Sequence, residues 1–149
     1  MKKRSGRRTR LETRLSSLET PLFLIDASRT VLFFNQGCEK ILEWSADELL
    51  GQTCDYAVDI DADECESICN LLCPPPEVLK GSRSEVPRYL LTRSGKTLPC
   101  VIRYTPLLDE SCQTKLVLGI MNISKHLVHY RPHPRHSNCT RNWQHYVCP

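Results

Sequence analysis

Three cysteines stand at regular intervals in the middle of the chain, at Cys65, Cys69 and Cys73. Intervals of four residues would place them along one face of a helix, and Cys54 could supply a fourth thiol. Thiolates are ligands for soft metal ions and iron–sulfur clusters. Three ligands on one rigid helix would span roughly 12 Å, which is too far for one metal. We therefore expect structural thiols that pack as small apolar side chains, without stoichiometric iron or zinc.

A second group of possible ligands lies near the C-terminal end. It contains His126, His129, His133, His136, Cys139, His145 and Cys148. The spacings of His133, His136 and Cys139, and of His145 and Cys148, are ones that zinc can use. However, residues 125–149 show no hydrophobic periodicity and are rich in His, Arg and Pro, which predicts an irregular tail. Such a tail binds metal only adventitiously, so we assign no metal site.

The sequence contains no recognisable catalytic set. It has no P-loop, no G-x-S-x-G and no H-E-x-x-H motif. A Cys–His nucleophile would need a tail histidine to reach a cysteine of the body, and nothing in the sequence places it there. We expect no enzymatic activity and no catalytic residues.

The composition indicates where the protein is located and which partners are not expected. The nine cysteines are an odd number, and no export signal precedes them, so a disulfide scaffold is not expected. No apolar run approaches the ~18–20 residues that span a bilayer, and we expect a cytoplasmic location. Residues 1–14 and 125–149 are basic, whereas residues 15–124 carry nine basic and sixteen acidic side chains. An acidic body argues against a nucleic-acid groove in the domain itself.

The first expected element is a short amphipathic helix from Arg10 to Glu19, which Pro21 closes. Leu11, Leu15 and Leu18 lie on one face of it, at spacings of four and three. A stripe this narrow needs a partner, either the domain itself or the same helix of a second copy. We expect a homodimer through these three leucines.

A hairpin and a helix should follow. The runs LFLID (residues 22–26) and TVLFF (residues 30–34) are typical of strands, and Asp26 can accept backbone hydrogen bonds in the turn between them. Asn35 is expected to cap a helix that turns Cys38, Ile41 and Leu42 inward.

Two more helices are expected before the pattern changes. The run SADELLG has the capping-box spacing at Ser45 and Glu48 and a C-terminal Gly51. Asp61 to Cys73 is predicted to be a third helix, capped by Asp61 and ended by the prolines at 74–76.

The second half has the period of strands. Three strand-like runs cover residues 84–93, 97–108 and 114–124, separated by the turns SGK and DESCQ. Residues 22–34 and 84–124 should therefore form one antiparallel sheet, with residues 36–79 mostly helical over one face. The fold class is α+β. We divide the chain into a basic leader with the amphipathic helix (1–20), an α+β domain (21–124) and the tail (125–149).

The stretch PLFLIDASRTVLFFNQGCEKILEWSADELLGQ resembles the start of a PAS domain, in which two strands lead to an asparagine that starts a helix. LLTRSGKTLPCVIRYTPLLDE is similar to the long hairpin of that family, and LVLGIMNIS to its final strand. The resemblance covers about Leu18 to Ser124. It implies a five-stranded antiparallel sheet with helices over one face and a small cavity that often holds a ligand or cofactor.

The resemblance also implies a function. PAS domains usually sense a signal and pass it to a kinase, cyclase or transcription-activating domain, and they commonly pair through a helix before the first strand. We expect a signal-sensing and interaction module of a two-component system or of transcriptional regulation. A small-molecule ligand and a separate histidine kinase or transcriptional regulator would be its partners.

Several residues depart from the family pattern. Arg29 stands where the first hairpin often has glycine, and Asn122-Ile123-Ser124 replaces the frequent Asp-Ile-Thr that links the sheet to an effector. Flavin photosensing in this family needs a motif resembling Asn-Cys-Arg-Phe-Leu-Gln, which ESICNLLC does not match. Haem sensing usually needs a histidine in the central region, and the first histidine is His126. The cofactor stays unidentified.

A second class of function is kept beside the sensor. The chain could be a metal- or redox-responsive protein that uses Cys65, Cys69 and Cys73 or the histidine- and cysteine-rich tail.

Overall fold

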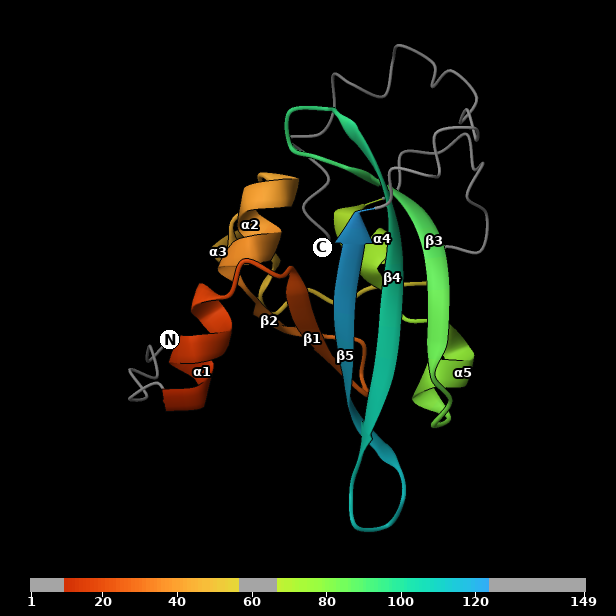
Figure 1. Ribbon diagram of the computed structural model, residues 1–149. Coiled ribbons are helices and arrows are strands. Elements are labelled where there is room, and N and C mark those ends of the chain that lie inside the picture. Colours follow the sequence, from red (N-terminus) through yellow and green to blue (C-terminus); the bar gives the residue numbers. More distant parts are fainter. Residues whose placement is uncertain (1–9, 57–66, 124–149) are drawn as a thin grey trace.

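The structure is a computed structural model that describes residues 10–56 and 67–123; Cys65 and the histidine- and cysteine-rich tail lie outside these ranges (Figure 1). The order of elements is the predicted one, with two strands, then helices, then three strands. The elements are α1 (Arg10–Ser17), β1 (Leu22–Asp26), β2 (Val31–Phe34), α2 (Gln36–Leu42), α3 (Ala46–Leu49), α4 (Ile68–Leu72), α5 (Pro76–Leu79), β3 (Ser84–Leu91), β4 (Thr97–Leu108) and β5 (Thr114–Ile123).

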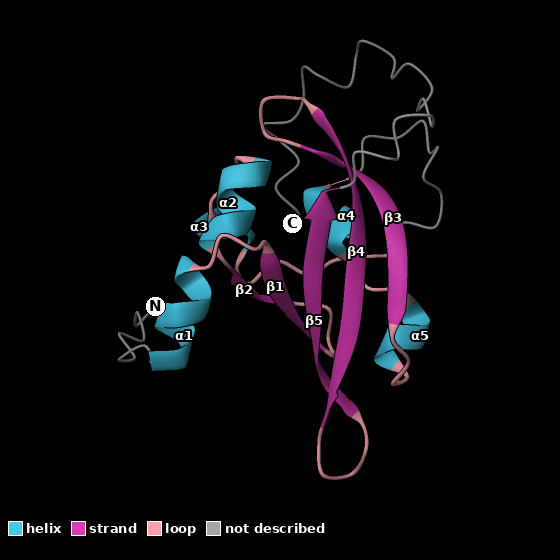
Figure 2. Cartoon of the chain, viewed as in Figure 1, coloured by secondary structure: helices cyan, strands magenta, loops and turns pink. Residues whose placement is uncertain are grey.

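The five strands form one sheet in the order β2-β1-β5-β4-β3, and every neighbouring pair is antiparallel. The α+β class and the single antiparallel sheet are thus confirmed. Because β2 and β3 occupy opposite edges, the segment between them must cross from one edge of the sheet to the other. That segment carries α2 to α5, and Figure 2 shows α4 and α5 behind the strands.

Strand side chains alternate between two faces, and the face toward the helices makes the core. On it lie Phe23, Ile25, Ile102, Tyr104, Val117 and Met121, all at most 2% exposed. The helices add Cys38, Leu42, Leu49, Ile68, Leu72 and Val78 to the same cluster. The residues on the opposite side of β5, such as Leu118 and Ile120, are only half-buried. In the described ranges, the helices are too short or too polar to cross a membrane.

Phe23 and Gly119 face each other across β1 and β5, and the phenyl ring of Phe23 lies against the backbone of Gly119. A Cβ at position 119 would stand 2.6 Å from two of the ring carbons. Glycine is therefore required by space at this position, because any side chain would meet the ring.

Asn35 caps α2 as the sequence predicts. Its Oδ1 accepts hydrogen bonds from the backbone N–H of Cys38 at 3.0 Å and of Leu22 at 3.1 Å. Its amide nitrogen lies 2.8 Å from the Thr20 carbonyl oxygen and 3.2 Å from that of Leu15. The side chain is 1% exposed, so one buried amide joins α1, β1 and α2.

The β1–β2 turn is built on Asp26. Its Oδ1 accepts the N–H groups of Ser28 and Thr30, both at 2.9 Å, as expected for an aspartate at this position. Arg29 has φ 64, the left-handed conformation that usually selects glycine. At the position where the family often has glycine, Arg29 therefore adopts the left-handed backbone conformation that glycine usually provides.

The predicted helix from Asp61 to Cys73 is wrong as one continuous element. Ser67 is extended, with φ −61 and ψ 144, and its side chain accepts the N–H of Cys69 as the cap of α4. The hydroxyl of Ser67 hydrogen-bonds to the local backbone, and α4 begins at the next residue. Cys73 is the residue after the last turn of α4, so Cys65, Cys69 and Cys73 do not form one helical row. The proline at 76 begins α5.

Candidate functional site

Buried sulfur-bearing and polar side chains gather where α4 meets β3 and β4. They come from four segments. Cys54 follows the Thr30–Thr53 bridge, Cys73 follows α4, and the others lie on β3 and β4. The hydroxyl of Tyr104 is influenced electrostatically by every other member of the group. We call this group the thiol–arginine cluster, and its members are Cys54, Cys73, Cys100, Arg88 and Tyr104, each at most 3% exposed.

Arg88 is the largest fully buried side chain of the described residues, at 2% exposure. Its position follows from the period of β3, since Val86, Arg88 and Leu90 share the face toward the helices. The guanidinium carbon stands 5.1 Å from the ring centroid of Tyr56, within the range of a cation–π contact. A buried cation requires compensating neighbours, and it is an unusual choice for an interior strand position.

Tyr104 ties the sheet to the end of α4. Its hydroxyl lies 2.9 Å from the carbonyl oxygen of Leu72 and 3.3 Å from that of Cys73. Burial raises the pKa of Tyr104 well above its ordinary value, although Arg88 opposes this rise. The phenol therefore stays protonated and serves as a hydrogen-bond donor from β4 to the last turn of α4.

Cys54 and Cys73 differ from the other described buried cysteines because each shifts the pKa of the other. A hydrogen bond from the Cys54 thiol lowers the pKa of Cys73, and the cations Arg29 and Arg88 lower it further against the effect of burial. The same contact raises the pKa of Cys54, together with burial. In contrast, burial raises the pKa of Cys100 to about 12.

The cysteines that the sequence singled out are thus placed differently from the row expected there. Cys69 is 2% exposed and Cys73 is fully buried, while Cys65 lies outside the described ranges. Among residues 10–56 and 67–123, no three His, Cys, Asp or Glu side chains are grouped as a metal site requires. The tail from His126 to Cys148 lies outside the description as well. What the sequence missed is that Cys54 and Cys73 are buried in the same core cluster.

The sequence also carried an overlooked signal for the cluster. A charged residue at an inward position of a predicted strand is exceptional, and Arg88 alternates with Val86 and Leu90 in the printed sequence. Tyr104 alternates with Ile102 in the same way. Both could have been marked as buried polar residues from the period of two alone.

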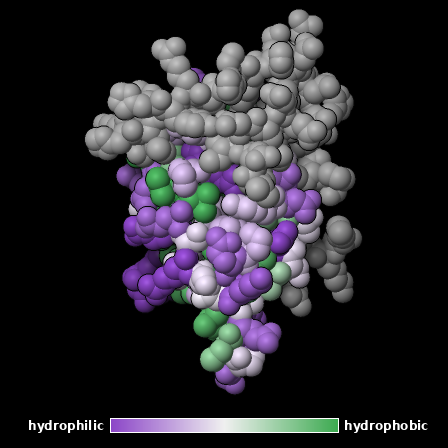
Figure 3. Space-filling model, turned by 90° about the vertical axis from the view of Figure 1, so that its right-hand side faces the viewer, coloured by the Kyte–Doolittle hydropathy of each residue, from purple (hydrophilic) through white to green (hydrophobic). Residues whose placement is uncertain are grey.

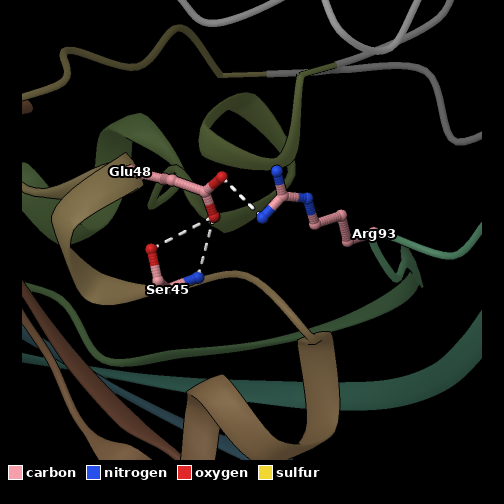
Figure 4. A network of polar contacts seen from close by, with 3 residues as sticks. All are labelled: Ser45, Glu48 and Arg93. Carbon is pink, nitrogen blue, oxygen red and sulfur yellow. Dashed lines mark hydrogen bonds and ion pairs between the residues drawn. The ribbon is translucent and has the colours of Figure 1, made fainter.

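A second polar network lies on the surface between α3 and the β3–β4 turn (Figure 4). Oε2 of Glu48 accepts the backbone N–H of Ser45 at 2.9 Å, which is the predicted glutamate half of the capping box. The other carboxylate oxygen of Glu48, Oε1, forms an ion pair with the guanidinium of Arg93 at 2.7 Å. The guanidinium of Arg93 also stands 5.6 Å from the ring centroid of Trp44. This network connects α3 to the turn between β3 and β4.

The leucines of the predicted stripe remain accessible on the domain, although α1 ends at Ser17 and Leu18 is the residue after it. Leu11 is 65% exposed and Leu18 is 44% exposed, while Leu15 is half-buried. Asn35 holds the carbonyl groups of Leu15 and Leu18, so the C-terminal end of the helix is fixed. The domain therefore covers only part of the predicted apolar stripe.

The fold is that of a known family. A model of the PAS fold matches residues 9–123, which is most of the chain, and the chain belongs to the PAS family. PAS domains are signal-sensing modules. No curated protein matches the sequence.

Solved structures agree on the fold. A PAS domain from a two-component sensor histidine kinase shares 16% identity and a TM-score of 0.56, over 76% of this chain and 93% of that one. The PAS domain of an HTR-like protein from Haloarcula marismortui shares 18% identity and a TM-score of 0.54, over 77% and 89%. An RNA-binding light-oxygen-voltage receptor shares 12% identity and a TM-score of 0.59, and the chain spans only 32% of that protein.

Proposed function

We propose that this PAS domain is a sensory and interaction module that forms a homodimer through α1 and acts on a separate histidine kinase or transcriptional regulator. The observation that supports the proposal is that α1 is anchored to the domain while its apolar side chains remain exposed. Its end is bonded to the buried Asn35, yet Leu11 and Leu18 stay largely exposed. A helix fixed in this way presents an apolar stripe to a partner.

Energetics favour a second copy of the same helix. An isolated helix of eight residues is not stable in water, so α1 depends on its contacts. Full burial of a leucine contributes ~1.5–3 kcal/mol. A symmetric dimer buries each leucine of the stripe twice, which can exceed an association cost of ~4–15 kcal/mol when burial is nearly complete.

The side of the molecule that carries β3 and α5 fits a dimer less well. Figure 3 shows the side of the molecule that carries β3 and α5, and there the described surface is mostly hydrophilic with small separate hydrophobic areas. In Figure 1, α1 lies at the other side, beside β1. Location in the cytoplasm belongs to the same proposal, and it is supported by Cys38, Cys54, Cys69, Cys73 and Cys100, all of which are buried free thiols.

The kinase or regulator partner is proposed by analogy with relatives. One similar structure is a domain of a two-component sensor histidine kinase, and function transferred from a shared fold is an analogy. The absent Asp of the closing strand, replaced here by Asn122, indicates that the output contact differs from the usual one. A small-molecule ligand in the core would be the signal.

Sedimentation velocity of the intact chain tests the dimer. We expect a concentration-dependent dimer for the parent and monomers for Leu11→Asp and Leu18→Asp, because a buried carboxylate at the interface is costly. Leu108→Asp is the matched control, since Leu108 is 50% exposed on β4 and should leave the dimer intact. Leu15→Asp should dissociate the dimer as well, with a loss of stability because Leu15 is half-buried. A parent that stays monomeric at high micromolar concentration would refute the proposal.

A further inference from the structure

The end of the β3–β4 hairpin lies directly beside the thiol–arginine cluster. Leu90 and Leu98 face each other across the two strands, and Arg88 and Cys100 form the next pair two residues further along. Side chains two residues apart on a strand point to the same face, so both pairs face the helices. Leu90 is fully buried, and Leu98 packs against the core. We call residues 90–98 the hairpin tip.

The hairpin tip is a two-stranded ribbon. In the described part of the chain, the pairing of β4 with β5 begins at Cys100 and Ile123, so residues 97–99 pair with β3 alone. A two-stranded hairpin is only marginally stable in water and needs another element to pack against. Figure 1 shows the tip bending away from the rest of the sheet toward α2. The position of the tip therefore depends on its contacts there.

Two backbone groups of the tip bind the end of α2. The N–H of Arg93 donates a hydrogen bond to the carbonyl oxygen of Leu42 at 3.0 Å. The N–H of Ser94 donates to Oε2 of Glu43, also at 3.0 Å. Glu43 is exposed, so water can replace its oxygen as the acceptor when the tip moves away.

Side chains add a second set of contacts between the tip and the helices. The guanidinium of Arg93 pairs with Glu48 at 2.7 Å and stands 5.6 Å from the ring centroid of Trp44. Nε1 of Trp44 lies 3.4 Å from the carbonyl oxygen of Leu91. The side chain of Arg93 is 58% exposed and that of Glu48 is 30% exposed, so each contact stabilises the closed tip only slightly.

We propose that the hairpin tip is a flap that detaches from α2 and α3 while the rest of the domain stays folded, and that its release opens the core at the Arg88–Cys100 pair. Detachment breaks the exposed polar contacts and removes one inward pair, Leu90 and Leu98, from the core. The pairing of β5 with β1 and with β4 is retained. An opening that breaks so few contacts costs less free energy than global unfolding.

The opening gives a small molecule a way into the core. In the closed structure Arg88 is 2% exposed and Cys100 is fully buried, so neither can be reached from solvent. Removal of the adjacent leucine pair uncovers both, because they are its nearest neighbours on the same face of the hairpin. The use of this opening by a ligand rests on the proposed sensory function, whereas the opening itself does not.

Thiol labelling of the reduced, intact chain tests the opening. N-ethylmaleimide is added under native conditions at several urea concentrations below the unfolding transition, and the labelling rate of each cysteine is read by peptide mass. Cys38 in α2 is the reference, because it is as deeply buried as Cys100 but lies outside the hairpin. We expect Cys100 to react roughly tenfold faster than Cys38 or more, with a weaker dependence on urea. Equal rates with equal dependence on urea would overturn the proposal, since the core would then open only by global unfolding.

Two arginine variants locate the opening. Arg93→Ala removes the ion pair and the ring contact of the tip, and it should speed the labelling of Cys100 about three- to tenfold. Arg103→Ala is the matched control, because Arg103 forms an equally short ion pair with Glu85 between the same two strands but outside the tip. That ion pair persists when the tip detaches, so the labelling rate of Cys100 should stay within about twofold of the parent's. Equal acceleration of Cys100 by the two variants would refute the assignment of the flap to residues 90–98.

The conservative variant and the parent chain complete the test. Arg93→Lys keeps a cation beside Glu48 and should retain most of the protection of Cys100 that Arg93→Ala loses. The comparison of Cys100 with Cys38 needs the parent chain only, so it decides the matter even when a variant fails to fold. Failure of the dimer is recognised separately by sedimentation. A monomer whose Cys100 still reacts before Cys38 would remove the proposed dimer and leave the flap in place.

Discussion

The side-chain amide of Asn35 donates a hydrogen bond to the carbonyl oxygen of Leu15 at 3.2 Å and thereby fastens α1 to the start of α2. The same amide nitrogen also lies 2.8 Å from the carbonyl oxygen of Thr20. Since Asn35 is almost fully buried, the N-terminal helix and the domain share one interior polar group. A displacement of α2 or β1 would therefore pull on the helix that we propose as the dimer contact.

Asn35→Asp should release α1 while keeping the cap of α2. The carboxylate still accepts the N–H groups of Leu22 and Cys38, but it faces the carbonyl oxygens of Leu15 and Thr20 without a proton to donate. Hydrogen exchange at pH 7 should show faster exchange in α1 than in α2. Asn35→Ala removes both sets of contacts and should lower the free energy of unfolding by about 2–4 kcal/mol in urea titrations. Equal protection of α1 in Asn35→Asp and in the parent would contradict this account.

Gly119→Ala should destabilise the domain through one contact, the ring of Phe23. The added Cβ would stand 2.6 Å from two ring carbons, and a well-packed core cannot absorb this without displacement. We expect a loss of about 1–3 kcal/mol in the free energy of unfolding.

A double-mutant cycle checks the cause. Phe23→Leu removes the ring, so Gly119→Ala should cost clearly less in the Phe23→Leu background than in the parent. Additive effects of the two substitutions would mean that the penalty arises elsewhere, for example from the backbone of β5.

Two substitutions of Glu48 should separate the helix cap from the ion pair (Figure 4). Glu48→Gln keeps an oxygen for the N–H of Ser45 and loses the charge that pairs with Arg93. The ion pair is largely exposed, with the Arg93 side chain 58% exposed, so this change should cost at most about 1 kcal/mol. Glu48→Ala removes both and should cost more, by the ~0.5–2 kcal/mol of a helix cap. Thermal unfolding of the two variants in low and high salt distinguishes these contributions, because only the ion pair is screened.

The sheet and the order of its strands along the chain could be predicted because the period of the apolar residues and the residue types of the turns agree. LFLID and LVLGIMNI alternate or run apolar, and Asp26 and Asn35 fix the turn and the cap that their types favour. Local signals of this kind depend on neighbours within a few residues, which the sequence shows directly.

The site could not be predicted because it depends on contacts between distant residues. Cys54 and Cys73 belong to different segments, and only the fold buries both in one cluster. The regular interval of Cys65, Cys69 and Cys73 was a misleading local pattern, since Ser67 is extended and α4 begins only after it. The sequence could indicate that Arg88 faces the core, but it could not indicate the contact of Arg88 with the ring of Tyr56.

Asp109 should make the stability of the β4–β5 turn depend on pH in acid. Its Oδ1 accepts hydrogen bonds from the hydroxyl of Ser111 at 2.7 Å and from the N–H groups of Ser111 and Gln113 at 2.9 and 3.0 Å. These bonds, first of all the one from the Ser111 hydroxyl, lower the pKa of Asp109 in the folded chain. Since the folded pKa lies below the unfolded one, its stabilising effect is complete above about pH 4 and is lost as the pH falls through the folded pKa. Asp109→Asn keeps the oxygen but does not titrate, so the advantage of the parent over this variant in urea titrations should be constant near pH 6 and shrink as the pH falls from about 4 to about 2. Glu110→Gln removes the same charge from the same turn and controls for the change in net charge. A constant difference between parent and Asp109→Asn across this range would show that the carboxylate does not stabilise the turn.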